Sequence, residues 1–244
     1  MPSKSKRPSN LPRRDFLKIV GLTGVASAMP LAETRAAAPA AVARDLGGQR
    51  PSTASGYVFF NSVEAQFIEA AVDTLIPADH VGPGALELGV ASFIDRQLAG
   101  SYGKGYRLYL EGPFAEGAPE QGYQLKLTPA ELMKAGIADV NGYVRGKHNG
   151  NFSDLKPNER AIVLGDIEKG KVGLATVPNT TFFSLLLQLT VEGYFSDPIH
   201  GGNKNKAAWK MIGFPGAGVI FTDLIGKYRN KRYHVEPVDI QDLS

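Results

Sequence analysis

The segment from Thr180 to Glu192 places the strongest constraint on how this chain folds. Its apolar side chains fall on every side of a helix and not along a single stripe. They are Phe182, Phe183, Leu185, Leu186, Leu187, Leu189 and Val191. Such a helix is stable only when other elements surround it, because each of its faces needs burial. We therefore expect a central helix, with Asn179 as its N-cap and the remaining elements around it.

The first half of the chain carries start and stop signals for two helices. Asn61 and Glu64 are the N-cap and third position of a capping box, and apolar residues follow at helical spacing to Leu75. A second helix is expected over residues 91–98, with Gly100 as the residue after its C-cap. These helices are candidates for the layer around the central one.

The middle of the chain adds two more helices. The motif Thr128-Pro129-Ala130-Glu131 combines an N-cap threonine, a proline at the first helical position and a glutamate at the third, so a helix should run from here to about Val144. Pro157 opens another, which ends near Gly170. Residues 100–127 have no clear period and predict a long loop, and no segment alternates with period two. The expected fold is mostly α: a single domain of several helices joined by long Gly/Pro-rich loops.

The first residues have the composition of an export signal. A basic stretch precedes a mildly apolar run of 13 residues, 19–31, and an alanine-rich stretch ends at Ala43. This run is too short to span a bilayer, which takes about 20 residues. The residues that resemble a bacterial twin-arginine signal are Arg13, Arg14, Phe16, Leu17 and Lys18. The alternative is a basic amphipathic helix or a disordered tail.

This reading divides the chain into four parts. Residues 1–43 are expected to be the signal peptide and 44–57 a polar linker or N-terminal arm. Residues 58–235 are expected to form the helical domain, and 236–244 a C-terminal tail. Because the twin-arginine pathway moves folded proteins, the domain is expected to work in the periplasm.

Composition excludes several classes of function. Of the 27 basic and 24 acidic residues, 20 and 22 follow position 43, so the expected mature chain is slightly acidic and no long basic patch suggests nucleic acid. The chain has no cysteine, which removes Cys-x-x-Cys-His haem attachment, iron–sulfur clusters and thiolate nucleophiles. We expect no cofactor in this chain.

Few residues suggest chemistry of their own. Asp79 and His80, with Asp197 and His200, could converge as a mixed carboxylate–imidazole metal site. No local spacing supports that site, and the favoured interpretation is that these side chains hold loop backbone by hydrogen bonds. The segment Gly82-Pro83-Gly84 begins like a dinucleotide-binding loop, but it follows a helix and not a strand.

Residues 193–217 form the densest segment, rich in glycine and proline, and contain the only tryptophan. Its candidate partner-contact residues are Tyr194, Phe195, Trp209 and Phe214. Aromatic side chains of this kind are common at the centres of protein interfaces, but they are also common in hydrophobic cores. The sequence leaves open whether this segment is an exposed contact surface or packs on the central helix.

Two strings in these regions resemble one family. The first is Glu69-Ala70-Ala71-Val72-Asp73-Thr74-Leu75-Ile76-Pro77-Ala78-Asp79 with Gly82-Pro83-Gly84-Ala85 and Gly89-Val90. The second is Gly193-Tyr194-Phe195-Ser196-Asp197-Pro198 with Gly201-Gly202-Asn203, Trp209-Lys210 and Gly213-Phe214-Pro215-Gly216-Ala217. Over roughly residues 58–220 the chain resembles the gluconate 2-dehydrogenase subunit 3 family.

The resemblance implies a small subunit without a cofactor, part of a membrane-associated sugar or sugar-acid dehydrogenase. In such complexes a large FAD-containing subunit oxidises the substrate and a cytochrome c subunit, carrying haem c, passes the electrons on. The small subunit carries the signal for the twin-arginine translocase, and the flavoprotein travels attached to it. The resemblance implies no catalytic residue in this subunit and does not fix the sugar.

Two functions therefore stay open. The first is a non-catalytic export and binding subunit, periplasmic and peripheral to the inner membrane through its complex. The alternative is a stand-alone periplasmic metal-dependent enzyme that uses its Asp and His residues.

Overall fold

A computed structural model describes residues 56–106, 108, 110–115, 117–118, 121–218 and 221–243. The described chain is mostly helical, and its only pairing of extended backbone is the isolated bridge between Gly216 and Val238. The mostly α fold expected from the sequence is confirmed. The expected signal peptide, with Arg13, Arg14, Phe16, Leu17 and Lys18, lies outside the described residues, as does the linker up to residue 55.

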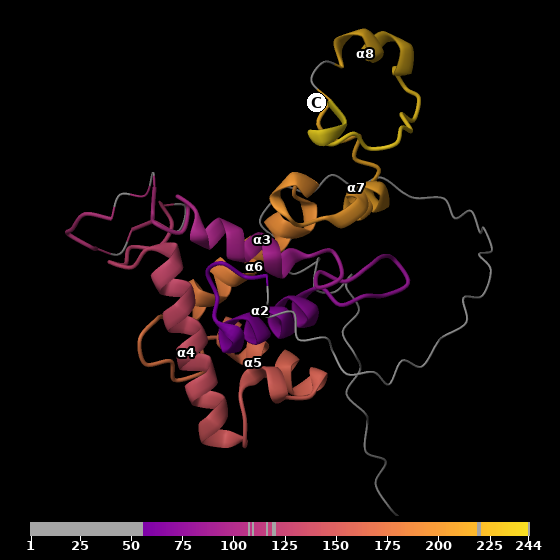
Figure 1. Cartoon of the computed structure of the whole chain (residues 1–244). Helices are drawn as coiled ribbons and strands as arrows, with labels where there is room; N and C mark the ends of the chain where they lie inside the picture. The colour runs from indigo at the N-terminus through magenta and orange to yellow at the C-terminus, as the bar shows by residue number, and fades with distance from the viewer. Residues whose placement is uncertain are drawn as a thin grey trace, which may run out of the picture. The chain divides into compact units, whose positions relative to one another are not determined.

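Helix α6 is the element around which the others pack. It spans Asn179–Phe195 and contacts five helices. They are α2 (Ser62–Leu75), α3 (Val90–Ala99), α4 (Pro129–Lys147), α5 (Pro157–Glu168) and α7 (Ala207–Ile212). Figure 1 shows α6 among α2, α3, α4 and α5. The central helix expected from its all-round apolar pattern is therefore present.

Two details of α6 differ from the expectation. Pro178 is the N-cap, because the Asn179 side chain donates to the carbonyl oxygen of Val172 (2.6 Å) and does not cap the helix. The helix also runs past Glu192 to Phe195, and one side of it is exposed: Ser184, Gln188, Val191, Glu192 and Phe195. The core therefore covers most of α6 and leaves a strip of its last turns at the surface.

The capping motifs identified helix starts correctly where the cap is local. Asn61 accepts from the amide of Glu64 (3.0 Å), whose carboxylate accepts from the Asn61 amide in return (3.0 Å). Thr128 and Glu131 form the same reciprocal box at α4, which continues three residues beyond Val144 to Lys147. Gly100 is the C-cap of α3 with φ −81°, so this position does not use the left-handed conformation available to glycine.

Asp95 fixes the start of the described domain. This carboxylate is 1% exposed on α3 and accepts hydrogen bonds from the backbone amides of Val58, Phe59 and Phe60, at 2.8, 3.0 and 2.9 Å. Three charge-assisted bonds to consecutive amides stabilise a buried carboxylate that would otherwise be costly. The chain is thus held against α3 from Val58, the position at which the helical domain was expected to begin.

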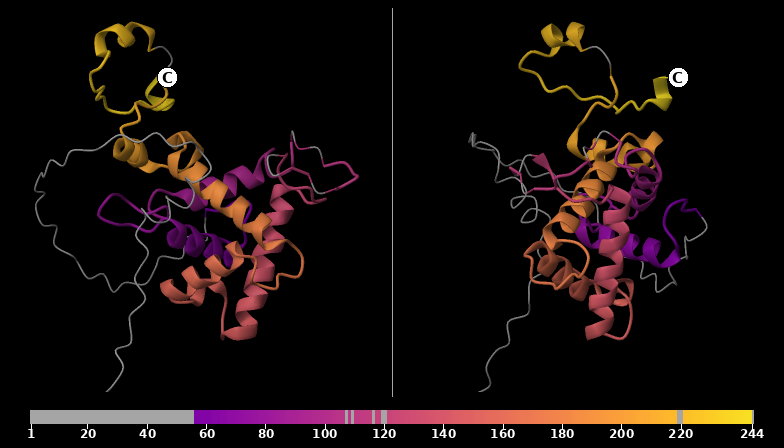
Figure 2. Two further views of the ribbon diagram at one scale, coloured as in Figure 1. Left: turned by 180° about the vertical axis from the view of Figure 1, so that it is seen from behind. Right: turned by 90° about the vertical axis from the view of Figure 1, so that its left-hand side faces the viewer.

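The segment after α6 is more ordered than the expected loop and tail. It contains short 3₁₀ turns, α7, and a further short helix, α8 (Thr222–Tyr228), which the sequence analysis did not predict. The chain then returns so that Val238 pairs with Gly216, which closes the loop seen in Figure 2. The end of the chain, 236–243, is consequently bound to the domain. Among the described residues, no helix is both long enough and apolar enough to cross a bilayer.

Close packing of α4 against α6 depends on Gly136. A β-carbon added there would lie 2.0 Å from Cδ2 of Phe182, an α6 side chain that is fully buried. Phe182 in turn packs against Phe67 of α2, with ring centroids 6.3 Å apart. The absence of a side chain at Gly136 is what lets the phenylalanine reach the α4 backbone.

We expect Gly136→Ala to lower the free energy of unfolding by about 1–3 kcal/mol, because the added methyl overpacks the core. Gly142→Ala on the same helix is the matched control: nothing lies within 4 Å of the added carbon, and alanine favours a helix over glycine by about 1 kcal/mol. Urea denaturation measures both. Equal effects of the two substitutions would contradict the packing described here.

Candidate functional site

The proposed metal-ligating carboxylates hold loop backbone instead. Oδ1 of Asp79 accepts from the amides of Val81 and Gly82, at 2.8 and 3.2 Å. Oδ1 of Asp197 accepts from the amide of Ile199 (3.0 Å), and its other oxygen accepts from the amide of Ile240 (3.0 Å). The bonds to Val81, Gly82 and Ile199 are the Asx-type turns that aspartate forms in loops, whereas the bond to Ile240 ties the end of the chain to this loop.

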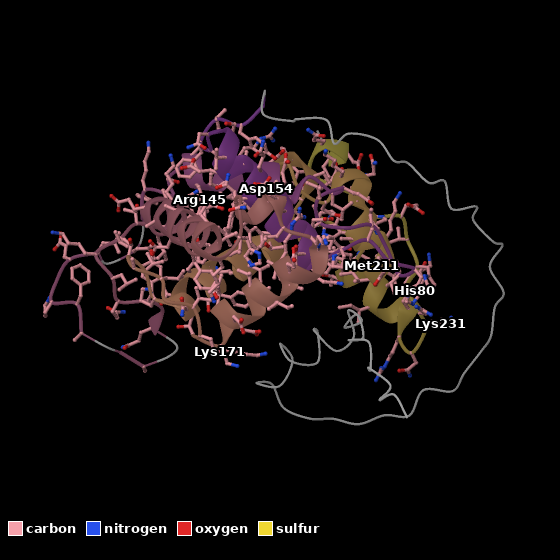
Figure 3. The ribbon with its side chains drawn as sticks, turned by 90° about the horizontal axis from the view of Figure 1, so that it is seen from below. His80, Arg145, Asp154, Lys171, Met211 and Lys231 are labelled. Atoms are coloured by element: carbon pink, nitrogen blue, oxygen red, sulfur yellow. The ribbon has the colours of Figure 1, made fainter. Side chains whose placement is uncertain are left out.

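The four residues Asp79, His80, Asp197 and His200 do not form a metal centre. Within the described part of the chain, no group of three or more His, Asp or Glu side chains is arranged to hold a metal ion. A β-carbon added at Gly82 would lie 2.8 Å from Sδ of Met211, so the loop that contains His80 packs against α7; Figure 3 labels His80 and Met211. The arrangement gives no support to the stand-alone metal-dependent enzyme.

One buried asparagine joins the end of α6 to the start of α7. Asn203 is 0% exposed and has a left-handed backbone, with φ 44°. Its Nδ2 donates to the carbonyl oxygen of Ser196 (2.9 Å), and its Oδ1 accepts from the amide of Ala208 (2.9 Å). The donor and the acceptor of the side-chain amide are both used, and together they fix the conformation of the turn between α6 and α7.

Lys206 adopts a backbone conformation that is costly for a residue with a β-carbon. Its φ of 57° is left-handed, which costs roughly 1–2 kcal/mol for an L-residue. Its ammonium group lies 2.5 Å from a carboxylate oxygen of Asp242 and 3.3 Å from one of Asp239. These ion pairs tie the last residues of the chain to the start of α7 and favour the strained turn.

Two of the four candidate contact residues are core side chains. Tyr194 is 1% exposed and its hydroxyl donates to the carbonyl oxygen of Pro83 (2.9 Å). Trp209 is 5% exposed and its Nε1 donates to the carbonyl oxygen of Phe195 (2.8 Å). Of the two interpretations that the sequence left open, packing in the core therefore holds for these two rings, and each donates a hydrogen bond to a backbone carbonyl oxygen.

The other two candidates are exposed and rest on the buried pair. Phe195 is 37% exposed and packs edge to face on Tyr194, at 5.0 Å between ring centroids. Phe214 is 42% exposed and packs the same way on Trp209, at 5.2 Å. Val191, one helical turn before Phe195 on the same face of α6, is 38% exposed. We call Val191, Phe195 and Phe214 the α6–α7 corner.

The aromatic residues of this site can be picked out from the sequence, but the polar residues that fix the backbone around them cannot. Asn203 lay in one of the strings that carry the family resemblance, without a role of its own, and Lys206, Asp239 and Asp242 were not singled out. No local pattern marks Asn203 or Lys206, because the partners of their side chains lie between 5 and 36 residues away along the chain. Asp239 and Asp242 bond each other across three residues, but that local pattern does not indicate their distant partner Lys206.

Trp209→Ala should lower the free energy of unfolding by about 3–5 kcal/mol, since it removes a buried aromatic ring. Phe214→Ala should cost only about 1 kcal/mol, the value of one exposed edge-to-face pair. Chemical denaturation of both variants checks this. If Phe214→Ala were as destabilising as Trp209→Ala, Phe214 would be core and could not serve as a contact residue.

Acid should release the end of the chain. The hydrogen bond from Lys206 is the main cause that lowers the pKa of Asp242 below its ordinary 3.8, and the same bond raises the pKa of Lys206. A lowered carboxyl pKa means that the stabilising effect is present above the unfolded value of 3.8 and is lost as pH falls from there through the folded pKa.

The amide of Asp239 donates to Asp242, so hydrogen-exchange protection of that amide, corrected for intrinsic rates, should drop below pH 3.8. Asp242→Asn should show weak protection at every pH. Protection that is unchanged at pH 3 in the unmodified chain would contradict the role given to this ion pair.

Comparison with known proteins identifies one related family. The family model for gluconate 2-dehydrogenase subunit 3 matches residues 62–216, more than half of the 244-residue chain. The match begins at the first residue of α2 and ends at the glycine that pairs with Val238, so it includes the whole α6–α7 corner. No curated protein and no solved structure matched the chain.

Proposed function

The chain belongs to the gluconate 2-dehydrogenase subunit 3 family, and on that premise we propose that it is the non-catalytic small subunit of a periplasmic dehydrogenase complex that oxidises gluconate or a related sugar. The redox cofactors belong to its partners: FAD in a large dehydrogenase subunit, and haem c in a cytochrome c subunit. Its own tasks are to bind the flavoprotein and to carry the signal that the twin-arginine translocase recognises.

The observation that carries this proposal is the construction of the α6–α7 corner within the region that matches the family. Two exposed aromatic rings are held on two buried rings, and the buried rings are fixed by hydrogen bonds to backbone carbonyl oxygens. A contact residue held this way loses little conformational freedom on binding, which is a main cost of association. Aromatic anchors of this kind contribute most of the energy in protein interfaces.

The proposed role in export rests on Arg13 and Arg14, which lie outside the described residues. A translocase that accepts only folded cargo can move a partner without a signal if that partner is already attached. The helices of the domain pack around α6, and Asp95 holds the residues just before α2, which supports its export in the folded state.

Phe195→Ala and Phe214→Ala should each weaken association with the flavoprotein by at least thirtyfold, because loss of a central aromatic anchor costs about 2 kcal/mol or more. Neither should lower the denaturation midpoint as Trp209→Ala does. Ile162→Ala is the matched control, since Ile162 is 64% exposed on α5, away from the corner. Titration calorimetry with the purified flavoprotein gives the affinities, and unchanged affinity in both aromatic variants would defeat the proposed surface.

Replacing Arg13 and Arg14 by lysine should retain both this chain and the flavoprotein in the cytoplasm. The planar guanidinium pair offers donors that an ammonium group cannot imitate. Cell fractionation with immunoblotting of both subunits measures the outcome. A flavoprotein that still reached the periplasm while this chain stayed behind would contradict the escort role, although binding at the corner could still hold.

A further inference from the structure

The segment Phe221–Val235, which we call the basic loop, has a net charge opposite in sign to that of the residues before and after it in the sequence. It contains four cationic residues and no acidic residue after Asp223. They are Lys227, Arg229, Lys231 and Arg232. Residues 58–220, by contrast, hold 14 basic and 17 acidic side chains, and 236–244 add three acidic ones. The positive charge of this end of the chain is therefore concentrated in one short segment.

The nearby carboxylates do not neutralise the basic loop. Asp239 and Asp242 pair with Lys206, and Glu236 lies 3.4 Å from the ammonium group of Lys210. Across the described residues, none of the recorded ion pairs includes one of the four cations of the loop. Their charge is thus available to an anion outside the chain.

Exposed apolar side chains accompany these cations. No residue of α8 is buried, and Ile225 on that helix is 67% exposed. Phe221 is 39% exposed and Val235 is 46% exposed, at the two ends of the loop. Burial of such side chains is favourable by about 25 cal/mol for each Å² removed from water, and the fold itself does not supply that burial.

A defined turn follows α8 and carries three of the four cations. The amide of Lys231 donates to the carbonyl oxygen of Tyr228 (2.8 Å), and Asn230 between them is left-handed, with φ 60°. The rings of Tyr228 and Tyr233 pack edge to face across the turn at 4.8 Å. The chain reversal places Arg229, Lys231 and Arg232 within a few residues of the end of α8.

From this combination we infer that the basic loop binds directly to an anionic lipid surface. A headgroup layer accepts cations at its phosphates and apolar side chains just beneath them, and it needs no shaped pocket. Long lysine and arginine side chains suit such a surface because their stems lie in apolar surroundings while their charges stay at the phosphates. An acidic protein surface is the competing partner, but α8 has no buried residue. Its exposed side chains therefore lack the buried support that holds Phe195 and Phe214 in fixed positions, and they suit a surface that needs no shaped pocket.

This inference goes beyond the proposed function. The small subunit would touch the membrane itself, through a surface distinct from the α6–α7 corner, and would not rely only on the cytochrome subunit for its place there. Residues 58–220 carry a net negative charge, which disfavours their contact with anionic lipid, so the same charges would also orient the subunit.

The test uses a fluorescent reporter at the loop, because the basic N-terminal segment of the full chain can bind vesicles by itself. The chain has no cysteine, so Ile225→Cys provides a single thiol for an environment-sensitive nitrobenzoxadiazole label. Ile162→Cys, at a site of similar exposure on α5, is the control (64% against 67%). Both labelled full chains are titrated with vesicles of phosphatidylcholine alone and with vesicles that also contain the anionic lipid phosphatidylglycerol.

We expect the label at position 225, and not that at 162, to brighten and shift to the blue only with the anionic vesicles, and to lose this response at high salt. In the labelled Ile225→Cys chain, K231Q/R232Q should raise the lipid concentration at half-saturation about thirtyfold. Each cation contributes about 1 kcal/mol to binding an anionic surface, and this variant removes two of them. K169Q/K171Q is the matched control and should change little; Lys171 lies well apart from Lys231 in Figure 3. Circular dichroism confirms that each variant is folded.

Three results would overturn the inference: equal responses at positions 225 and 162, a response to neutral vesicles, or no effect of K231Q/R232Q. If the fluorescence of the label at 225 did not change with lipid but changed with purified flavoprotein or cytochrome subunit, the loop would be a protein contact instead. Failure here leaves the proposed function intact, since association with the flavoprotein is tested by Phe195→Ala and Phe214→Ala.

Discussion

Burial of α6 is the constraint on which the rest of this structure depends. Its apolar residues face in most directions, so α2, α3, α4 and α5 all pack against it, and Gly136 is needed for one of those contacts. The same burial fixes the end of the helix, where the hydroxyl of Tyr194 is held by the carbonyl oxygen of Pro83. Because Tyr194 cannot move, the next ring along the helix, Phe195, has a fixed place at the surface.

The chain beyond α6 is held by polar contacts more than by apolar burial. Asn203 uses its whole amide to join α6 and α7, and Lys206 binds the returning end of the chain through Asp239 and Asp242. These contacts divide the surface after α6 into two parts with different chemistry. The α6–α7 corner is aromatic and supported by buried rings, which suits a protein partner, whereas the basic loop is cationic and its exposed apolar side chains have no such support, which suits lipid.

The parts of the fold that depend on neighbouring residues could be predicted from the sequence. The capping boxes at Asn61 and Thr128 act over three residues, so their pattern was sufficient to place α2 and α4. Asn179 has the right chemistry for an N-cap, but its side chain has a better partner in Val172, and that partner exists only once the loop is folded.

The candidate site was harder to predict for the same reason. No local pattern distinguishes Trp209, which is buried, from Phe214, which is exposed and packs on it, because the sequence around them has no regular spacing of apolar residues. The short helix α7 follows left-handed Asn205 and Lys206, a start that no capping rule indicates. The twin-arginine signal stays a prediction, since it lies outside the described residues.

Site-specific photocrosslinking can show whether the α6–α7 corner contacts the flavoprotein. A benzophenone amino acid is placed at Phe214 or at Ile162, and each chain is co-expressed with its flavoprotein and irradiated. If the corner is the contact surface, position 214 gives a crosslink to the flavoprotein and position 162 gives none. A crosslink from 162 with none from 214 would contradict it.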